Sequence, residues 1–264
     1  KHFTMFGMLR TPSLYLVCAV LLSGSCKQNN KAPQSNPTAK SASPVTNRGS
    51  ISASEMPSDR VFTYAEVSPE SLDPNLIAES SGSGIGSQIF EPLVEFDANG
   101  GSVLPAQALR WTVNDAGTIY TFYLRKTTWS DGVPIRAQDY LYSWERALNP
   151  ATRSRNADQY WIIKGAKAYN IGDTSDFKTV GVRAKGEYRL EVELEGPSPY
   201  FLDLMSYVVF SPVPRHVVEK HGNKWTDPEN IVVNGPFTLS EWKLRERIVL
   251  TKNTRYWDAE KVWL

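Results

Sequence analysis

The stretch YRLEVELEG, residues 188–196, limits the fold of this chain more than any other segment. Apolar and charged side chains alternate along it, which places the two kinds on opposite faces of a strand. The apolar face would carry Tyr188, Leu190, Val192 and Leu194, and the charged face Arg189, Glu191, Glu193 and Glu195. A strand buried on one side only is typical of antiparallel or mixed sheets, because purely parallel sheets are covered on both faces.

Helices accompany this strand. The stretch RAQDYLYSWERALNP, residues 136–150, predicts a helix that ends at an Asn-Pro pair and buries Tyr140, Leu141, Trp144 and Leu148 on one face. Alternation predicts further strands over 61–67, within 118–126 and, as a pair, within 234–253. Strands mixed with helices, without regular βαβ repetition, indicate a mixed α/β or α+β fold.

Residues suited to covalent or metal chemistry are few. The only cysteines are Cys18 and Cys26, so the chain beyond residue 26 can form no disulfide, cysteine metal site or thiol nucleophile. His216 and His221 are five residues apart and are expected at a solvated helix end rather than on a metal. No serine-hydrolase, zinc-protease or nucleotide-loop motif is present. We therefore predict no catalytic residue, no metal and no cofactor, and we favour a binding protein over a secreted hydrolase.

Neither charge nor loop composition predicts a nucleic-acid or nucleotide ligand. The chain has 29 basic and 28 acidic residues and a net charge of +1, whereas nucleic-acid binding needs a concentrated basic patch. The glycine-rich stretch SGSGIG (81–86) lacks the lysine and spacing of a phosphate loop. We expect a mobile or ligand-facing loop there, with phosphate binding as the alternative, followed by a helical stripe of Ile85, Ile89 and Leu93.

Residues 1–26 predict an export signal, with Met8 as the expected start. Arg10 precedes a short apolar run at 14–22 and then small residues, which is the order found in signal peptides. The apolar run is shorter than the roughly 20 residues that span a bilayer, which favours an export signal. A short membrane anchor is the alternative.

Cys26 follows the small residues directly and resembles the lipid-attachment cysteine of bacterial lipoproteins. Ordinary secretory cleavage is the alternative. Residues 27–59 are rich in Pro, Ser, Asn and Lys and carry few apolar side chains. We expect a flexible linker there between a membrane surface and a folded body that begins near residue 60.

Several segments together resemble the peptide- and nickel-type extracytoplasmic solute-binding proteins of bacterial ABC importers, and most of all their oligopeptide-binding branch. The resemblance is colinear over about residues 60–264. It runs through SLDP (71–74), IFEPLVEFDANG (89–100), YTFYLRKTTWSDGVPIRAQDYLYSWERALNP (120–150), LEVELEGPSPYFLDLM (190–205), SPVPRHVVEKHGNKWTDPENIVVNGPFTLSEW (211–242) and ERIVLTKNTRYWDA (246–259).

The resemblance implies an α/β, type II periplasmic-binding fold, a two-lobed clamp that encloses a solute and closes by hinge motion. The first lobe would contain residues 60–90 and 214–264, and a subdomain characteristic of the family would fill 91–213. In the family, the second lobe follows the point where this sequence ends. We therefore expect the N-terminal half of a longer protein, with the second lobe absent.

The resemblance also implies a function. The protein would capture oligopeptides in the periplasm or at the cell surface and deliver them to the membrane subunits of an ABC permease. It would be a monomer held at a membrane by a lipid on Cys26. The alternatives are a family member that binds another solute, such as an oligosaccharide or a metal chelate, and a surface lipoprotein that transports nothing.

The residues carried over as ligand contacts are Ile77, Ala78, Glu79 and Ser80, through their main chain, and Asn156. By position after SLDP, residues 77–80 would pair with the ligand main chain, as in strand addition; an ordinary surface loop is the alternative. Asn156 stands where peptide binders commonly carry a tyrosine, a departure that puts ligand contact there in question. Arg136 replaces the threonine that usually opens the following helix, and we expect the lost cap to cost about 1 kcal/mol.

Overall fold

The computed structural model describes residues 62–63, 66–97 and 101–263. The predicted export segment, Cys26 and the predicted linker at 27–59 lie outside the described residues. Every helix and strand that the structure describes lies between residues 80 and 261.

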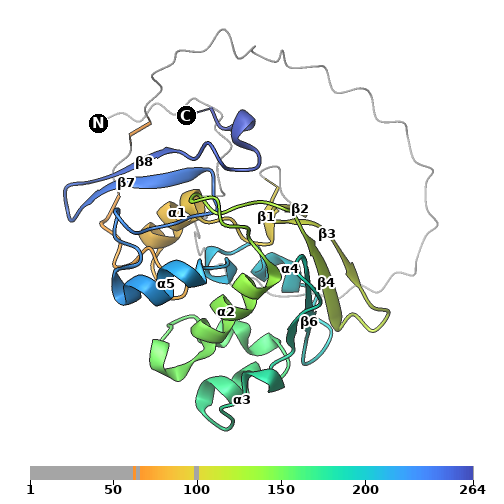
Figure 1. Cartoon of the computed structure of the whole chain (residues 1–264). Helices are drawn as coiled ribbons and strands as arrows, with labels where there is room; N and C mark the ends of the chain where they lie inside the picture. Colours follow the sequence, from red (N-terminus) through yellow and green to blue (C-terminus); the bar gives the residue numbers. More distant parts are fainter. Residues whose placement is uncertain (1–61, 64–65, 98–100, 264) are drawn as a thin grey trace, which may run out of the picture. The chain divides into compact units, whose positions relative to one another are not determined.

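The largest sheet has four antiparallel strands (Figure 1). Phe122 pairs with Leu190 and Tyr120 pairs with Val192, and all four side chains are buried. The prediction of a strand buried on one face is therefore confirmed. In spatial order the strands are β3 (Ala108–Val113), β4 (Ile119–Leu124), β6 (Arg189–Glu193) and β5 (Val182–Ala184).

The apolar face of this sheet is covered by aromatic side chains. The ring of Phe201, in the short helix α4 (Phe201–Leu204), lies 4.6 Å from Tyr120 and 6.3 Å from Phe122, centroid to centroid. Tilted aromatic pairs at such distances stabilise a core beyond the area that they bury. The sheet is thus closed on one side by the chain that follows β6.

Helix α2 (Ala137–Leu148) packs beside β5 and β6. Tyr140, Trp144 and Leu148 are fully buried and Leu141 is partly buried, which confirms the predicted helical stripe. The expected loss of a cap at Arg136 is only half right. Its side chain caps nothing, but its main-chain N–H donates to Asp139 Oδ2 over 2.7 Å. Burial in turn raises the pKa of Asp139 to about 6, against the effect of that hydrogen bond.

Two hairpins and several short helices complete the described fold. Helix α1 packs against strand β7, and Figure 1 shows it beside the β7–β8 hairpin. These elements are α1 (Ser80–Ile89), β1 (Val94–Phe96), β2 (Val103–Pro105), α3 (Ala166–Ile171), α5 (Arg215–His221), β7 (Phe237–Lys243) and β8 (Arg247–Lys252). The short 3₁₀ turns are η2 (Pro150–Thr152), η3 (Ala157–Ile162), η4 (Phe177–Thr179), η5 (Val208–Phe210), η6 (Gly222–Lys224) and η7 (Ala259–Lys261).

Two local predictions are wrong. The stretch SGSGIG is not a loop, because helix α1 begins at Ser80 and contains all of it. Glycines are used there for close packing: a Cβ at position 86 would lie 2.7 Å from Ile77 Cδ1. The described residues of the predicted strand at 61–67, which are 62–63 and 66–67, lie in no strand.

Three segments that carry the family resemblance meet around the carboxylate of Glu91, which is almost fully buried. Trp257 Nε1 donates to Glu91 Oε2 over 2.8 Å and Gln107 Nε2 donates to the same oxygen over 2.5 Å. The hydroxyl of Tyr256 donates to Glu91 Oε1. Burial nevertheless outweighs these hydrogen bonds and raises the pKa of Glu91 to about 7. We call Glu91, Gln107, Asn234, Tyr256 and Trp257 the Glu91 cluster.

Asn234 joins this cluster to the segment before β7. Its Oδ1 accepts from the Glu91 main-chain N–H over 3.0 Å, and its Nδ2 donates to the Glu91 carbonyl over 2.8 Å. The neighbouring Gly235 lies so close to the chain that a Cβ there would sit 2.6 Å from the Ile89 carbonyl carbon. The Asn-Gly pair of the NGPF stretch therefore has a structural role, through the hydrogen bonds of Asn234 and the close packing at Gly235.

Candidate functional site

The predicted ligand-binding segment, residues 77–80, connects the SLDP loop to helix α1. Ile77 is fully buried, and its N–H donates to the Asp73 carbonyl over 2.9 Å. Ala78 and Ser80 are exposed. Glu79 has an extended main chain (φ −122°, ψ 162°) and directly precedes the helix. One residue thus anchors the segment in the core while its neighbours face outward.

Asn156 contacts this segment directly. Its Nδ2 donates to the Ile77 carbonyl oxygen, and its Oδ1 accepts from Gln159 Nε2 over 3.1 Å. The structure therefore brings Asn156 and Ile77 together across 79 residues of sequence. The contact supports the segment, and a direct role of any of these residues in ligand binding stays a prediction.

The side chain of Glu79 folds back along the loop that precedes it. Glu79 Oε1 accepts from the Glu70 N–H over 2.9 Å, and Glu79 Oε2 accepts from the Ala78 N–H over 3.2 Å. The Ala78 carbonyl oxygen accepts no hydrogen bond within the described part of the chain. Of the main-chain N–H and C=O groups of Ile77 and Ala78, only the Ala78 carbonyl has no hydrogen-bond partner among the described residues, and we call it the open carbonyl.

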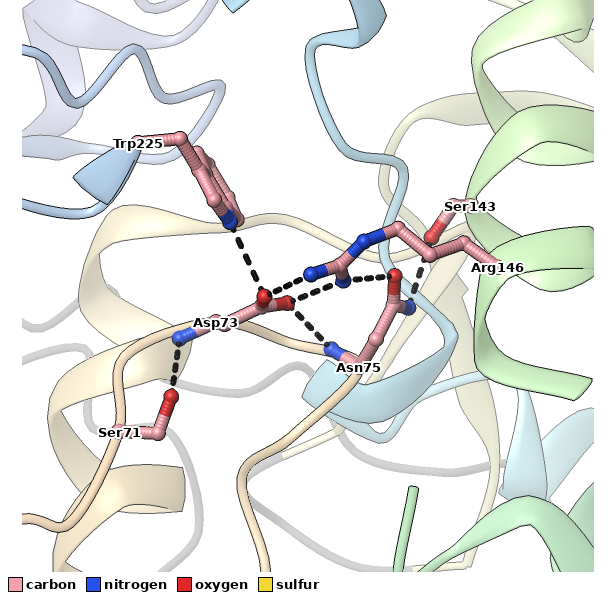
Figure 2. A network of polar contacts seen from close by, with 6 residues as sticks. All are labelled: Ser71, Asp73, Asn75, Ser143, Arg146 and Trp225. Carbon is pink, nitrogen blue, oxygen red and sulfur yellow. Dashed lines mark hydrogen bonds and ion pairs between the residues drawn. The ribbon is translucent and has the colours of Figure 1, made fainter. Parts of the chain in front are cut away.

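A nearly buried ion pair holds the SLDP loop against helix α2 (Figure 2). Arg146 Nη2 lies 2.6 Å from Asp73 Oδ2, and Arg146 Nη1 lies 2.9 Å from Asp73 Oδ1. Trp225 Nε1 also donates to Asp73 Oδ2, over 3.0 Å. Only 4% of the Asp73 side chain and 18% of the Arg146 side chain are exposed. A paired arginine and carboxylate in this forked arrangement has well-defined geometry, so it specifies how the loop lies against the helix.

Asn75 extends this network (Figure 2). Its N–H donates to Asp73 Oδ1 over 3.0 Å, and its Oδ1 accepts from Arg146 Nη1 over 2.7 Å. Its Nδ2 donates to Ser143 Oγ over 3.1 Å. Sequence reasoning missed Asn75, Ser143 and Arg146. For Ser143 and Arg146, the only signal available was a polar side chain beside the apolar stripe of a helix, and this pattern is also typical of an ordinary solvated face.

No group of three or more His, Cys, Asp or Glu side chains in the described ranges is placed to hold a metal ion. His216 lies at a helix end as expected, but its Nε2 pairs with Asp131 Oδ2 at 2.6 Å. Among residues 62–63, 66–97 and 101–263, no helix is both long and apolar enough to cross a bilayer.

The sequence from residue 102 onward identifies the family of this chain. The family described as Bacterial extracellular solute-binding proteins, family 5 Middle, matches residues 102–264. The chain belongs to this family. The match covers more than half of the chain. It includes the four-stranded sheet, helix α2 and the NGPF and YWDA segments that contact Glu91.

Two curated relatives extend the match toward the N-terminus. The probable deoxycholate-binding periplasmic protein YgiS of Escherichia coli is 41% identical over 205 residues, which are 76% of this chain and 38% of that protein. The periplasmic oligopeptide-binding protein OppA of Escherichia coli is 42% identical over 195 residues, or 73% of this chain and 35% of that protein. The chain thus spans little more than a third of the length of these relatives.

Solved structures of family relatives confirm the fold. The oligopeptide-binding protein OppAIV of Borrelia burgdorferi has a TM-score of 0.71 and 41% sequence identity. That match covers 74% of this chain and 39% of the OppAIV chain. The murein tripeptide-binding protein MppA of Escherichia coli has a TM-score of 0.72 at 34% identity, over 75% of this chain and 39% of its own. The predicted mixed α/β, type II periplasmic-binding fold is confirmed, and the named relatives are binding proteins.

Proposed function

We propose that this protein is the solute-binding component of an ABC importer, which captures oligopeptides outside the cytoplasmic membrane and delivers them to a permease. Relatives named as oligopeptide-binding proteins support this proposal at 42% identity over most of the chain. In the proposed arrangement, residues 60–90 and 214–264 belong to the first lobe and 91–213 to the subdomain. Cys26 is the proposed attachment point of a lipid that holds a monomeric protein at the membrane.

The observation that carries the proposal is the placement of residues 77–80. The segment is exposed at Ala78, yet it follows a loop that the nearly buried Asp73–Arg146 pair holds against helix α2. A rigid main chain with an open carbonyl can pair with an extended peptide without reading its side chains. Affinity for many peptides of different sequence would follow from such main-chain contacts, with water filling the side-chain pockets.

Direct titration tests this proposal. The native protein, produced from its own gene, is expected to bind Ala-Ala-Ala and Lys-Lys-Lys saturably by calorimetry, without hydrolysing them. At a peptide concentration 100 times the Kd, the free energy of unfolding should rise by about 2.7 kcal/mol. Deoxycholate is tested in parallel, since a 41% identical relative is named for it, together with maltotriose and a nickel–histidine chelate. Binding of one of these three but of no peptide would disprove peptide capture.

Replacing Asn156 by alanine tests the support of the segment. The variant loses the hydrogen bonds to Ile77 and Gln159, so we expect peptide Kd to rise about three- to tenfold and unfolding free energy to fall by about 1–2 kcal/mol. Asn170→Ala is the matched control, because Asn170 also makes two side-chain hydrogen bonds, to Leu148 and Trp161. Equal effects of the two variants on Kd would show that Asn156 has no special role.

A further inference from the structure

The carboxylate of Glu79 accepts a main-chain hydrogen bond from the segment 77–80 itself. Both main-chain groups of Ile77 are bound inside the protein, to Asp73 and Asn156. Ala78 is exposed whereas Ile77 is buried, so the main chain of the segment reaches the surface at Ala78. Strand pairing uses the N–H and the C=O of the same residue. The Ala78 carbonyl is open, but the Ala78 N–H donates to Glu79 Oε2.

The surroundings of Glu79 accommodate this folded-back side chain. A Cβ at Gly82 would lie 2.6 Å from Glu79 Oε1 and 2.9 Å from the Ser71 carbonyl oxygen. Only glycine in the first turn of α1 leaves room for both groups. The carboxylate makes no capping hydrogen bond to the first turn of its own helix, although it directly precedes that helix. Its two oxygens instead close the loop from Glu70 to Ala78.

We propose that Glu79 is a built-in competitor of the ligand at the segment 77–80. Its carboxylate satisfies the Ala78 N–H while the site is empty, and a peptide carbonyl must displace it to form the second main-chain hydrogen bond. This inference rests on the proposed peptide capture and adds its regulation: the affinity of the site is set by how firmly Glu79 holds Ala78. The same contact keeps the loop closed without ligand, which prevents an unpaired donor on an exposed edge.

The charge of the competitor determines the size of the effect. A carboxylate is a stronger acceptor than the peptide carbonyl that replaces it, because hydrogen bonds to ionised groups are roughly twice as strong as neutral ones. The contact is long, at 3.2 Å, and Glu79 is partly exposed, so the competition is weak enough to be overcome. We expect Glu79→Ala to lower the Kd for Ala-Ala-Ala about three- to tenfold.

The experiment compares the native full-length protein with Glu79→Ala, Glu79→Gln and the control Glu187→Ala, which removes an exposed carboxylate paired with Arg136. Peptide Kd is measured by calorimetry, and amide hydrogen exchange over residues 70–79 is measured by mass spectrometry without ligand. Tighter binding together with faster exchange in Glu79→Ala, an intermediate Glu79→Gln and an unchanged control are expected. Glu79→Gln keeps the size of the side chain, so it serves if the alanine variant folds poorly.

Two results would overturn the inference while peptide capture survives. The first is unchanged exchange in both Glu79 variants, which would mean that the carboxylate does not hold the Ala78 N–H. The second is faster exchange with an equal or higher Kd, which would mean that the freed N–H is not used by the ligand. If neither wild type nor variants bind any peptide, the proposed function itself fails and the competitor role fails with it.

Discussion

Asp73→Ala is expected to lower the free energy of unfolding by about 3–5 kcal/mol, which is the usual penalty for removing one partner of a buried ion pair. The remaining Arg146 side chain, of which 18% is exposed, would be left beside an empty space without its counter-charge. Trp225 Nε1 and the Asn75 N–H would lose their acceptor as well. Urea unfolding followed by tryptophan fluorescence measures the change.

The exposed pair of Arg136 and Glu187 provides the control for this result. Its side chains are 43% and 61% exposed, so Glu187→Ala should change unfolding free energy by less than about 1 kcal/mol. The double variant Asp73→Ala/Arg146→Met should lose less unfolding free energy than the two single variants lose in total, since no unpaired charge remains. Strict additivity would contradict a coupled buried pair. Peptide affinity should fall with Asp73→Ala, because Ile77 is bonded to the same loop.

Glu91→Ala is expected to have a similar effect, of about 3–5 kcal/mol, for a different reason. Three donors, from Gln107, Tyr256 and Trp257, converge on this carboxylate, and their loss of an acceptor leaves buried polar groups unpaired. Each unpaired group costs about 1–3 kcal/mol. The total loss is smaller than the sum of the three costs, because the surrounding structure relaxes. Glu91→Gln keeps the shape but supplies one acceptor oxygen and two N–H groups, so it should be intermediate. A change below about 1 kcal/mol in Glu91→Ala would contradict the Glu91 cluster.

The free energy of unfolding should depend on pH through Glu91, because burial raises the pKa of this carboxyl more than its hydrogen bonds lower it. Burial raises its pKa from an ordinary 4.5 to about 7. Between these two pH values, the folded protein therefore keeps a proton that the unfolded chain has lost. Its contribution is fully present below pH 4.5 and is lost as pH rises through 7, a decrease of about 3 kcal/mol. Glu91→Gln should remove this decrease in urea unfolding curves taken between pH 4.5 and 8. Parallel curves for the two proteins would show that Glu91 does not titrate there.

Periodicity predicted the regular elements well. The alternation around Leu190 and the stripe through Trp144 each placed apolar side chains on the correct face, because burial of one face is a local property of the sequence. The start of helix α1 could not be predicted in this way. Gly82 and Gly86 suggested a loop, whereas the structure uses them to let Glu79 and Ile77 approach the helix closely. Close approach depends on partners whose positions are known only in the folded chain.

The candidate site was chosen by resemblance, and only the structure shows which residues contact it. Residues 77–80 were placed by their position after SLDP, but nothing in the sequence joins Ile77 to Asn156, 79 residues away. The same holds for Asp73, Arg146 and Trp225, which come from three distant segments. Polar networks of this kind have no period, because each member is selected by its partner in space rather than by its neighbours along the chain.

The Glu91 cluster also sets an order of events during synthesis. Glu91 meets Tyr256 and Trp257 across 165 and 166 residues, so its carboxylate lacks these two of its three donors until the chain has been made beyond residue 257. Contacts between such distant residues form late, because long loops must close first. At about 5–20 residues per second, a growing chain spends roughly 10–30 seconds with this cluster unmade.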